Sequence, residues 1–369
     1  MKGYYIFFSN TKSSGVSKKI NMQIAEMAKY SEIELITLPK RSRKLIKRIW
    51  GILLWTSNQY DYKQLFSQLV NPAFLYIRYA RSDRKAIEFY KKVKEYYPKC
   101  KIIIELPTYP SDKECWWSIN YFFLLKDRYY RRELKRYVGR FVTFSTDEVI
   151  WGVPTIRIMN GINVDKEKMV QGCGKEGVIR LGTVAFLHKS HGYERWIKGL
   201  AKYYQGDFKE IVELHIIGEG AALSYYKKFV QHYKMENYVI FYGKKEGEEL
   251  DKIYNNIDIA LGAFGAYKKG IFRASSLKIR EYLAKGLPII SGCEEDVFED
   301  APDFPYYLEM KNDDSIINID NVLYFYDKVY RKGISRQNIR NEIRNFAKEK
   351  VDISVTMVPV IDYIKSRRG

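Results

Sequence analysis

The sequence predicts an α/β protein of two doubly wound domains that face each other across a cleft, and three observations carry this prediction. The chain has 369 residues, which at roughly 150 residues per domain is long enough for two separate cores. Two series of short β-branched or aromatic runs alternate with helical patterns, which is typical of parallel sheets covered by helices on both faces. A structure-breaking Asn-Gly in the polar stretch NGINVDKEK (160–168) separates the two series.

The first series predicts the strands of an N-terminal domain over residues 1–163. Each run is short and apolar, as expected for a buried parallel strand. The runs are YYIFFS (4–9), FLYIRY (74–79), KIIIE (101–105), FVTFS (141–145) and TIRIM (155–159). From Ser17 onward, apolar residues repeat at Ile20, Ile24 and Met27, which predicts a helix against the core, with Ser17 as its cap.

The second series predicts a C-terminal domain over residues 164–369. Its runs are VIRLGT (178–183), VELHIIG (212–218), VIFYG (239–243), IDIALG (257–262) and LPIIS (287–291). Helical patterns separate the runs, for example the apolar stripe of Trp196, Leu200 and Tyr203. We expect the last segment, 350–369, to pack back onto the N-terminal domain.

The composition is that of a folded protein without a membrane span. Hydrophobic residues make up 46% and charged residues 29%, which excludes the disordered class. The first residues, MKGYYIFFSN, indicate a strand rather than a signal peptide, and no stretch approaches the roughly 18 apolar residues that cross a bilayer. The four cysteines form no CxxC pair or zinc pattern. We therefore expect a reduced, cytoplasmic protein.

Positive charge is concentrated in two segments of a chain whose formal net charge is +19. KRSRKLIKRIWGILLW (40–55) has six basic residues and no acid, and YFFLLKDRYYRRELKRYVGR (121–140) has seven basic residues against two acids. Both mix the charge with large apolar side chains. Three interpretations stay open: a nucleic-acid patch, a core helix with a solvated basic end, and a helix lying on an anionic membrane.

Ligands of open parallel sheets bind beyond the carboxyl ends of the strands, so the residues that follow strands are candidate ligands. After the first strand, SNTKSSGVSKKI (9–20) places Gly15 in a Ser-rich turn that begins a helix, where free amides favour a phosphate. The segment is neither GxGxxG nor a P-loop. On this motif alone, a plain strand–turn–helix is the better interpretation.

The second domain offers similar candidates. Lys189 and His191 follow its first strand run, where a Lys can place positive charge against a diphosphate leaving group. A solvated Lys and a His bonded to backbone are an equally good interpretation. The run HIIGEG brings Gly218 and Gly220 to the same edge, where missing side chains permit close approach of a ligand.

The segment FRASSLKIREYLAKGLPIISG (272–292) carries the most chemistry. Ser275 and Ser276 stand at a helix start, and Lys278 and Glu281 share one face of its first turns because they are three residues apart. This arrangement supplies a cation and helix amides for a phosphate, and a carboxylate that can accept two hydrogen bonds from a ribose diol. A commonplace surface ion pair is the alternative.

A family resemblance follows from the order of these motifs. GVSKKI, NGIN, HGYER, LHIIGEG, VIFYG and SSLKIREYLAKGLPII occur in the order found in nucleotide-sugar-dependent glycosyltransferases of the GT-B fold. The series is most similar to the retaining enzymes of family 4, and it spans the chain from Gly15 to Ile290. The resemblance implies two Rossmann-like domains, of which the second holds a nucleoside-diphosphate sugar and the first presents the acceptor.

The resemblance also implies roles for single residues. Glu281 would take the ribose hydroxyls, Lys189 and Lys278 would lie near the diphosphate, and the backbone near Tyr242 and Gly243 would read the base. The candidate catalytic residues are Lys189, Lys278 and Glu281. The candidate donor-binding residues are Gly15, His191, Gly218, Gly220, Tyr242, Gly243, Ser275, Ser276, Lys278 and Glu281.

One position departs from the family pattern. The family often carries two glutamates eight positions apart, and Glu281 corresponds to the second, whereas Arg273 occupies the position of the first. What the first glutamate does must therefore be done differently here. The amides around Ser276 would reach the diphosphate, and Gly15 would lie against it from the other domain.

The N-terminal domain supplies the candidate acceptor-binding residues. KIIIELPTYPSDKE ends a strand with Glu105 and then presents Thr108 and Tyr109 between two prolines, a rigid loop that could bind a sugar acceptor. A proline-stiffened turn with a capping carboxylate is the alternative. Arg78 ends the strand FLYIRY and is the fourth candidate, with a buried ion pair as its alternative.

Together these observations favour a hexosyl transfer from a nucleoside-diphosphate sugar to a hydroxyl of a growing, lipid-linked surface glycan, and the family resemblance implies that the transfer retains configuration. We expect no metal and no cofactor besides the donor substrate, because no convincing DxD-like pair ends a strand. The basic segments suggest a peripheral enzyme of polysaccharide biosynthesis on the inner face of the cytoplasmic membrane. The alternative is a basic nucleic-acid-binding protein, although none of the usual binding motifs appears.

Overall fold

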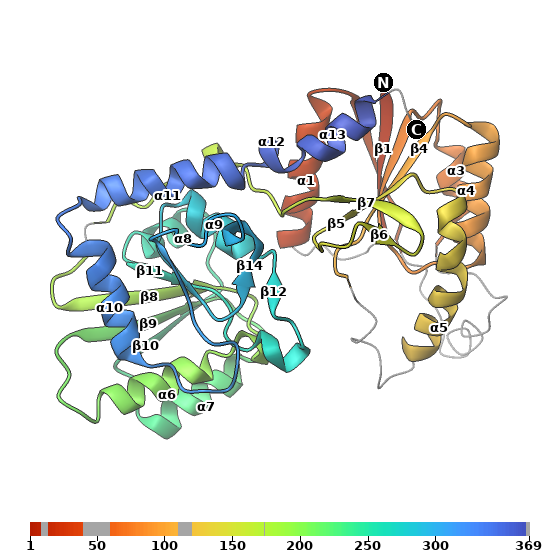
Figure 1. Ribbon diagram of the computed structural model, residues 1–369. Helices are drawn as coiled ribbons and strands as arrows, with labels where there is room; N and C mark the ends of the chain where they lie inside the picture. Colours follow the sequence, from red (N-terminus) through yellow and green to blue (C-terminus); the bar gives the residue numbers. More distant parts are fainter. Residues whose placement is uncertain (9–13, 40–59, 110–119, 173, 367–369) are drawn as a thin grey trace. The chain divides into compact units, whose positions relative to one another are not determined.

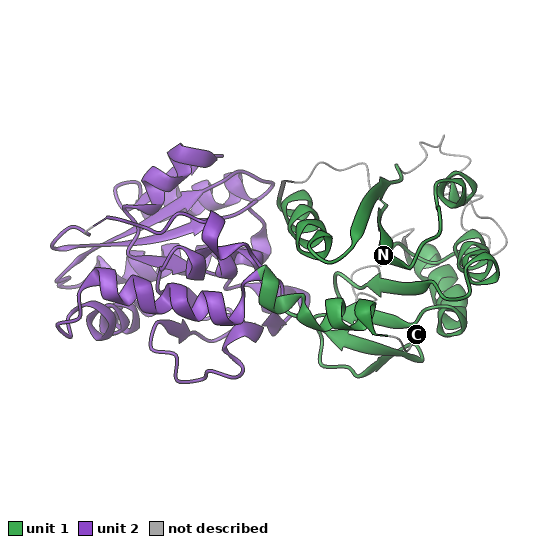
Figure 2. Ribbon diagram, turned by 90° about the horizontal axis from the view of Figure 1, so that it is seen from above, with its two compact units in different colours: residues 1–159, 353–369 green, residues 160–352 purple. Residues whose placement is uncertain are grey.

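The structure is a computed structural model that forms two compact units (Figure 2). Unit 1 comprises residues 1–159 and 353–369, and unit 2 comprises residues 160–352. The residues that the structure describes are 1–8, 14–39, 60–109, 120–172 and 174–366. The basic segment 40–55 lies outside the described residues. Among the helices that are described, none is both long and apolar enough to cross a bilayer.

Unit 1 is built on a seven-stranded sheet of order β2-β1-β3-β4-β5-β7-β6, in which only the β6–β7 pair is antiparallel. Its strands are β1 (Lys2–Phe7), β2 (Glu32–Thr37), β3 (Phe74–Arg78), β4 (Lys101–Glu105), β5 (Arg140–Thr143), β6 (Val149–Ile150) and β7 (Val153–Arg157). The five predicted runs of this domain are confirmed as β1, β3, β4, β5 and β7. The edge strand β2 was missed because its sequence, EIELIT, alternates acidic and apolar residues and leaves most of them exposed.

Helices cover both faces of this sheet (Figure 1). They are α1 (Ser14–Ala28), α3 (Tyr62–Ser67), α4 (Arg84–Tyr96), α5 (Asn120–Tyr130), the 3-10 turn η2 (Arg131–Arg136), α12 (Ile353–Thr356) and α13 (Val358–Lys365). Because successive strand residues point to opposite faces, Tyr4 packs toward α3 and α4 while Tyr5 packs toward α1 and α13. Helix α1 begins at Ser14, so Ser17 lies within its first turn and is not its cap.

The end of the chain belongs to unit 1. Met357, Val360, Ile361 and Ile364 are buried in one core with Ile20 of α1. The contacts divide the units after Met159 and again after Asp352, a few residues from the expected boundaries at 163 and 350. The chain passes from unit 1 to unit 2 and then back.

Unit 2 has a fully parallel six-stranded sheet of order β10-β9-β8-β11-β13-β15 and a separate two-stranded sheet, β12-β14. The strands are β8 (Val178–Val184), β9 (Ile211–Ile217), β10 (Val239–Gly243), β11 (Ile259–Leu261), β12 (Arg273–Ala274), β13 (Ile289–Ser291), β14 (Glu294–Glu295) and β15 (Tyr307–Glu309). The helices are α6 (Glu194–Tyr203), α7 (Leu223–Tyr233), α8 (Gly247–Tyr254), α9 (Leu277–Ala284), α10 (Ile319–Tyr330) and α11 (Arg336–Lys350). The short 3-10 turns are η3 (Val164–Lys166), η4 (Lys189–His191), η5 (Ala266–Lys269) and η6 (Asp296–Phe298). All five predicted runs are confirmed as strands.

The strand orders locate one switch point in each sheet. In unit 2 the chain builds β8, β9 and β10 toward one edge and then β11, β13 and β15 toward the other, so the direction changes between β8 and β11. In unit 1 it changes between β1 and β3. Ligands of doubly wound sheets bind at the carboxyl ends of the strands beside this point.

Candidate functional site

The hydroxyl of Tyr193 joins three elements at the switch point of unit 2. Tyr193 is fully buried just before α6, and its hydroxyl donates to the carbonyl oxygen of Gly262, which follows β11 (3.1 Å). The Thr183 hydroxyl in β8 lies 2.6 Å from the Tyr193 oxygen and must be the donor in that contact, since Tyr193 has one proton. The Lys278 ammonium donates a further bond at 3.1 Å. The network therefore fixes a cation of α9 against the ends of β8 and β11.

Lys278 and His191 form the electrostatic centre of this site. Burial lowers the pKa of Lys278. Burial, followed by the neighbouring Lys278 charge, lowers the pKa of His191 to about 2, so its imidazole is neutral at physiological pH. Nδ1 of His191 accepts the backbone amide of His188 (3.3 Å), which leaves Nε2 protonated. The site thus offers an ammonium and a neutral N–H donor to an anionic ligand.

Glu281 lies one turn along α9 from Lys278. Tyr254, at the end of α8, is buried and donates its hydroxyl to the Glu281 carboxylate (2.9 Å). Burial, and then the Glu281 charge, raise the pKa of Tyr254 well above its usual value, so its hydroxyl keeps the proton. Tyr254 therefore orients a carboxylate that is itself only partly buried.

Gly218 and Gly220 face protein backbone. Both have positive φ angles, 131° and 150°. A Cβ at Gly218 would lie 1.9 Å from the carbonyl oxygen of Ala185, and one at Gly220 would lie 2.5 Å from the backbone nitrogen of Leu187. We expected these glycines to admit a ligand. They instead make room for the segment between β8 and η4, and a direct contact of their backbone with a ligand stays a prediction.

The end of β10 is tied to the same loops. The Tyr242 hydroxyl lies 2.8 Å from Nδ1 of His215, and the two rings are stacked. The carbonyl oxygen of Gly243 accepts the amide of Gly218 (2.8 Å). The Tyr242 side chain is therefore engaged within the sheet, and a contact of this backbone with a base stays a prediction.

Lys189 has a different environment from Lys278. Its side chain is exposed, and its ammonium lies 4.8 Å from the centroid of the Tyr225 ring on α7. The placement of both lysines on one diphosphate stays a prediction, and Lys278 is the one that the fold positions.

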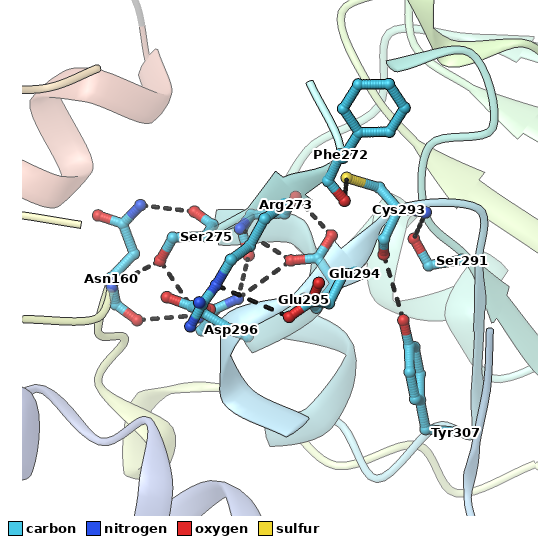
Figure 3. Close-up of polar contacts among 12 residues, drawn as sticks. Asn160, Phe272, Arg273, Ser275, Ser291, Cys293, Glu294, Glu295, Asp296 and Tyr307 are labelled. Carbon is cyan, nitrogen blue, oxygen red and sulfur yellow. Dashed lines mark hydrogen bonds and ion pairs between the residues drawn. The ribbon is translucent and has the colours of Figure 1, made fainter. Parts of the chain in front are cut away.

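Ser275 and Ser276 are engaged by protein groups, of which Asn160 and Glu295 are labelled in Figure 3. The Ser275 hydroxyl accepts the amide of Asn160 (3.0 Å), and Ser276 donates both its amide and its hydroxyl to Glu295 (3.1 and 2.8 Å). Glu295 is buried, so its oxygens require donors. The Ser276 amide is therefore directed at Glu295, which corrects the diphosphate contact expected of that amide.

Arg273, which the family resemblance led us to compare with the first of two glutamates, is paired with carboxylates, among them Glu294 (Figure 3). Its guanidinium pairs with Glu299 and lies 3.9 Å from Glu294, its register partner in β14. The positive charge of Arg273 is thus neutralised within unit 2.

Glu105 of unit 1, an expected acceptor contact, is fully buried. Its carboxylate accepts hydrogen bonds from Lys19 (2.9 Å), Gln23 (2.7 Å), Tyr76 (2.7 Å) and Arg78 (2.7 Å). Burial by itself would raise the pKa of Glu105, but Lys19 and Arg78 outweigh it and lower the pKa to about 2. Glu105 is therefore the centre of a buried ion-pair cluster, which corrects the acceptor role expected of it. Arg78 pairs with Glu105 but stays partly exposed, so its acceptor contact stays a prediction.

The other candidates of unit 1 stay open. Thr108 is exposed after β4, and Tyr109 is half-buried with its ring 6.0 Å from that of Trp151. Gly15 is exposed in the first turn of α1, and a Cβ there would meet nothing within 4 Å. Their surroundings suit a ligand contact and a plain surface equally well.

Tyr193, Tyr254 and Glu295 were not predicted from the sequence. The two tyrosines resemble ordinary core aromatics in the sequence, because the partners of a hydroxyl come from distant elements. Tyr193 does carry a signal, its place in HGYER between a strand and a helix. Glu295 carries none, since β14 has only two residues.

Solved structures that resemble this chain over almost its whole length decide the fold. HepE of Anabaena, solved with UDP, is 12% identical with a TM-score of 0.64 over 99% of both chains, and it has also been solved with UDP-glucose. The lipopolysaccharide outer core galactosyltransferase WaaB is 13% identical, with a TM-score of 0.61 over 99% of both chains. A sucrose-phosphate synthase from Thermosynechococcus elongatus is 11% identical, with a TM-score of 0.65 over the same share. The chain has the GT-B fold.

The GT-B fold is the one that the ordered motifs implied. A scan of protein-family models finds no match, and a search of curated proteins finds none either. At these identities the likeness concerns the fold alone, so membership of the retaining family 4 stays a prediction.

Proposed function

We propose that this GT-B protein transfers a glycosyl group from a nucleoside-diphosphate sugar to a hydroxyl of a glycan. The observation that carries the proposal is the partly buried Lys278 ammonium, held by Tyr193 at the switch point of unit 2, with Glu281 on the same helix. A diphosphate needs a cation such as the Lys278 ammonium. A ribose diol can donate two hydrogen bonds to a carboxylate such as that of Glu281. The complexes of HepE with UDP and UDP-glucose, which share the fold, support the same ligand class.

In this proposal the residues of unit 2 hold the donor and stabilise its leaving group. Lys278 and the neutral Nε2–H of His191 donate to the diphosphate, whose negative charge grows as the bond to the sugar breaks. Glu281, oriented by Tyr254, accepts the ribose hydroxyls. These donors take the place that a metal ion has in metal-dependent enzymes.

The proposed transfer retains configuration. The bond between the anomeric carbon and the phosphate oxygen breaks, and the acceptor oxygen bonds to the same face of that carbon. The acceptor proton passes to the departing phosphate oxygen, so no protein nucleophile is needed. The donor class further suggests a hexosyl transfer that extends a surface polysaccharide.

We further propose that the acceptor is lipid-linked and that unit 1 docks on an anionic membrane surface. Phe122, Leu125 and Tyr129 are exposed at i, i+3 and i+7, so they share one face of α5. Exposed basic residues follow in η2, among them Arg132 and Arg136. Apolar side chains beside Lys and Arg suit an interface where each basic residue contributes about 1 kcal/mol. In this proposal the enzyme works at the inner face of the cytoplasmic membrane.

A ligand screen tests the donor proposal. Thermal stability is measured with UDP, GDP, NAD and a DNA oligonucleotide, and the donor panel is then followed by mass spectrometry of the products. We expect stabilisation by a nucleoside diphosphate and a product heavier than the acceptor by one sugar. Stabilisation by NAD or DNA but by no nucleoside diphosphate would reject the proposal.

Liposome flotation tests the docking proposal. Replacing Phe122, Leu125 and Tyr129 by Ser should reduce binding to vesicles that contain anionic lipid. The matched control replaces Ile316 and Tyr324, which are exposed apolar residues of unit 2, and should float like the unchanged protein. Equal flotation of all three proteins would remove α5 from the membrane contact.

A further inference from the structure

A buried polar network holds the loop that enters α9 (Figure 3). At its centre, Glu295 accepts the Ser276 amide on one oxygen and the Ser276 hydroxyl on the other (3.1 and 2.8 Å). Glu295 is 1% exposed, and it lies on β14, which pairs with β12 just before the loop. One carboxylate thus fixes both polar groups of the residue at which the helix begins.

Arg280 closes the network from within α9. It is fully buried and pairs with Glu295 (3.3 Å) and with Asp296. It also donates to the carbonyl oxygens of Asn160 (3.1 Å) and Ser276 (3.3 Å), and to the hydroxyl of Ser275 (3.2 Å). The loop is therefore held by a carboxylate on one side and a guanidinium on the other.

The network determines what the first turn of α9 presents. A Ser at a helix start usually bonds an amide of the first turn with its own hydroxyl. Ser276 makes no such bond, because its hydroxyl is turned inward to Glu295. Lys278 is two residues farther on, so its position over Tyr193 depends on how Ser276 is held.

We infer that Glu295 is a positioning residue for the donor: it holds Ser276 inward and thereby sets the first turn of α9, with Lys278, for the diphosphate. The inference rests on the proposed function. Glu295 acts through Ser276 and Arg280 and does not itself touch the ligand. Its ionised form accepts two hydrogen bonds from Ser276 and pairs with Arg280, whereas its protonated form gives up part of both.

Glu295 changes its charge near neutral pH. Burial raises the pKa of Glu295 to about 7, against the opposing effects of Arg280 and the Ser276 hydrogen bonds. The groups that face it are Arg280 and Lys278 of α9, Asp296 of η6, Cys293 and Glu294 of its own segment, and Tyr307 of β15. Burial raises the pKa of the Cys293 thiol to about 12 and that of Tyr307 higher still, so both stay neutral. Donor affinity should therefore weaken as the pH falls below neutrality.

The test measures binding of UDP-glucose, with a panel of other nucleoside-diphosphate sugars, between about pH 5.5 and 8. The diphosphate of these probes is doubly esterified and does not titrate in that range. We expect the unchanged protein to bind about five- to tenfold more weakly at the acid end, which corresponds to the loss of about one net hydrogen bond. Glu295→Gln should bind at every pH as weakly as the unchanged protein does at the acid end, because Gln resembles the protonated acid. Asp296→Asn, which keeps the Ser276 contacts but removes the charge that shares Arg280 with Glu295, should bind as tightly at pH 8 and should weaken only at a lower pH than the unchanged protein.

A second readout needs no ligand. Hydrogen exchange of the Ser276 amide, corrected for its intrinsic pH dependence, should lose protection as the pH falls and should be equally low at all pH values in Glu295→Gln. An unchanged pH profile and unchanged protection in Glu295→Gln would overturn the inference. Failure of the unchanged protein to bind any nucleotide sugar would overturn the proposed function instead, and the exchange measurement would still decide whether Glu295 holds Ser276.

Discussion

Two buried carboxylates, Glu105 in unit 1 and Glu295 in unit 2, show how similar burial can lead to different roles. Each is at most 1% exposed. Glu105 is surrounded by two cations and two neutral donors, and its pKa falls to about 2. Glu295 shares Arg280 with a second carboxylate, Asp296, and its pKa rises to about 7.

The two carboxylates are equally buried, but they differ in how far nearby positive charges offset the cost of desolvation. Lys19 and Arg78 together offset the desolvation cost of Glu105, so this carboxylate stays ionised, stabilises unit 1 and does not contact solvent. The Arg280 guanidinium, which Glu295 shares with Asp296, does not fully offset the desolvation cost of Glu295. The charge of Glu295 therefore changes with pH. A carboxylate at a strand end therefore indicates a functional group only when its partners leave it incompletely satisfied.

The largest effect is expected from breaking the ion-pair cluster around Glu105. Glu105→Ala removes the carboxylate with which the buried Lys19 and the partly buried Arg78 pair among the described residues, so the free energy of unfolding should fall by about 3–5 kcal/mol. Chemical denaturation of the full chain measures it. Glu34→Ala, which removes a surface partner of Lys2, is the control and should change little. A Glu105→Ala protein of normal stability that has lost acceptor binding would return Glu105 to the acceptor site.

Removing the Lys278 ammonium should affect ligand binding more than folding. Lys278→Ala should weaken nucleoside-diphosphate binding about 30- to 100-fold, because a charge-assisted hydrogen bond is worth about 2–3 kcal/mol. Isothermal titration measures the dissociation constant. Lys189→Ala, which removes an exposed cation, should weaken binding only a few-fold. A larger loss in Lys189→Ala than in Lys278→Ala would reverse the assignment.

The pH dependence of stability should have opposite signs for the two carboxylates. The depressed pKa of Glu105 contributes stability above its unfolded pKa of about 4.3, which is lost as the pH falls toward about 2. The raised pKa of Glu295 contributes stability below about 4.3, which is lost as the pH rises through about 7. Between about pH 5.5 and 8, core amides of unit 2 should therefore lose about 2 kcal/mol of exchange protection. Glu295→Gln should abolish this slope, and a slope that persists would contradict the assignment.

The smallest effects are expected from replacing Glu281 and Tyr254, and they distinguish the carboxylate that binds the ribose from the hydroxyl that orients it. Glu281→Ala should weaken nucleoside-diphosphate binding about tenfold through lost hydrogen bonds to the ribose. Tyr254→Phe removes only the orienting bond and should cost about two- to threefold. A deoxyribose analogue should bind the Glu281→Ala protein and the unchanged protein alike. Unchanged affinity for the ribose ligand in Glu281→Ala would remove Glu281 from the site.

Sequence reasoning predicted the elements better than the contacts. All ten strand runs that it identified are strands, because a buried parallel strand is a continuous apolar run that is visible locally. It also placed Lys278 and Glu281 on one face of a helix, since three-residue spacing is a local property. It missed the edge strands β2, β6 and β15 and the small sheet of β12 and β14, whose polar or short sequences have no such signal.

The sequence by itself determined the two alternating series, the helix that carries Lys278 and Glu281, and the basic–apolar segment of α5. Only the tertiary structure decided which charges are satisfied. Ser276 and Glu295 are 19 residues apart, and Lys19 and Glu105 are 86 apart. The energy of a buried charge depends on every group that replaces its water, and those groups come from elements that only folding brings together. For this reason Glu105, which looked like a ligand contact, is a structural centre, and Glu295, which had no signal, is the residue we place behind the donor site.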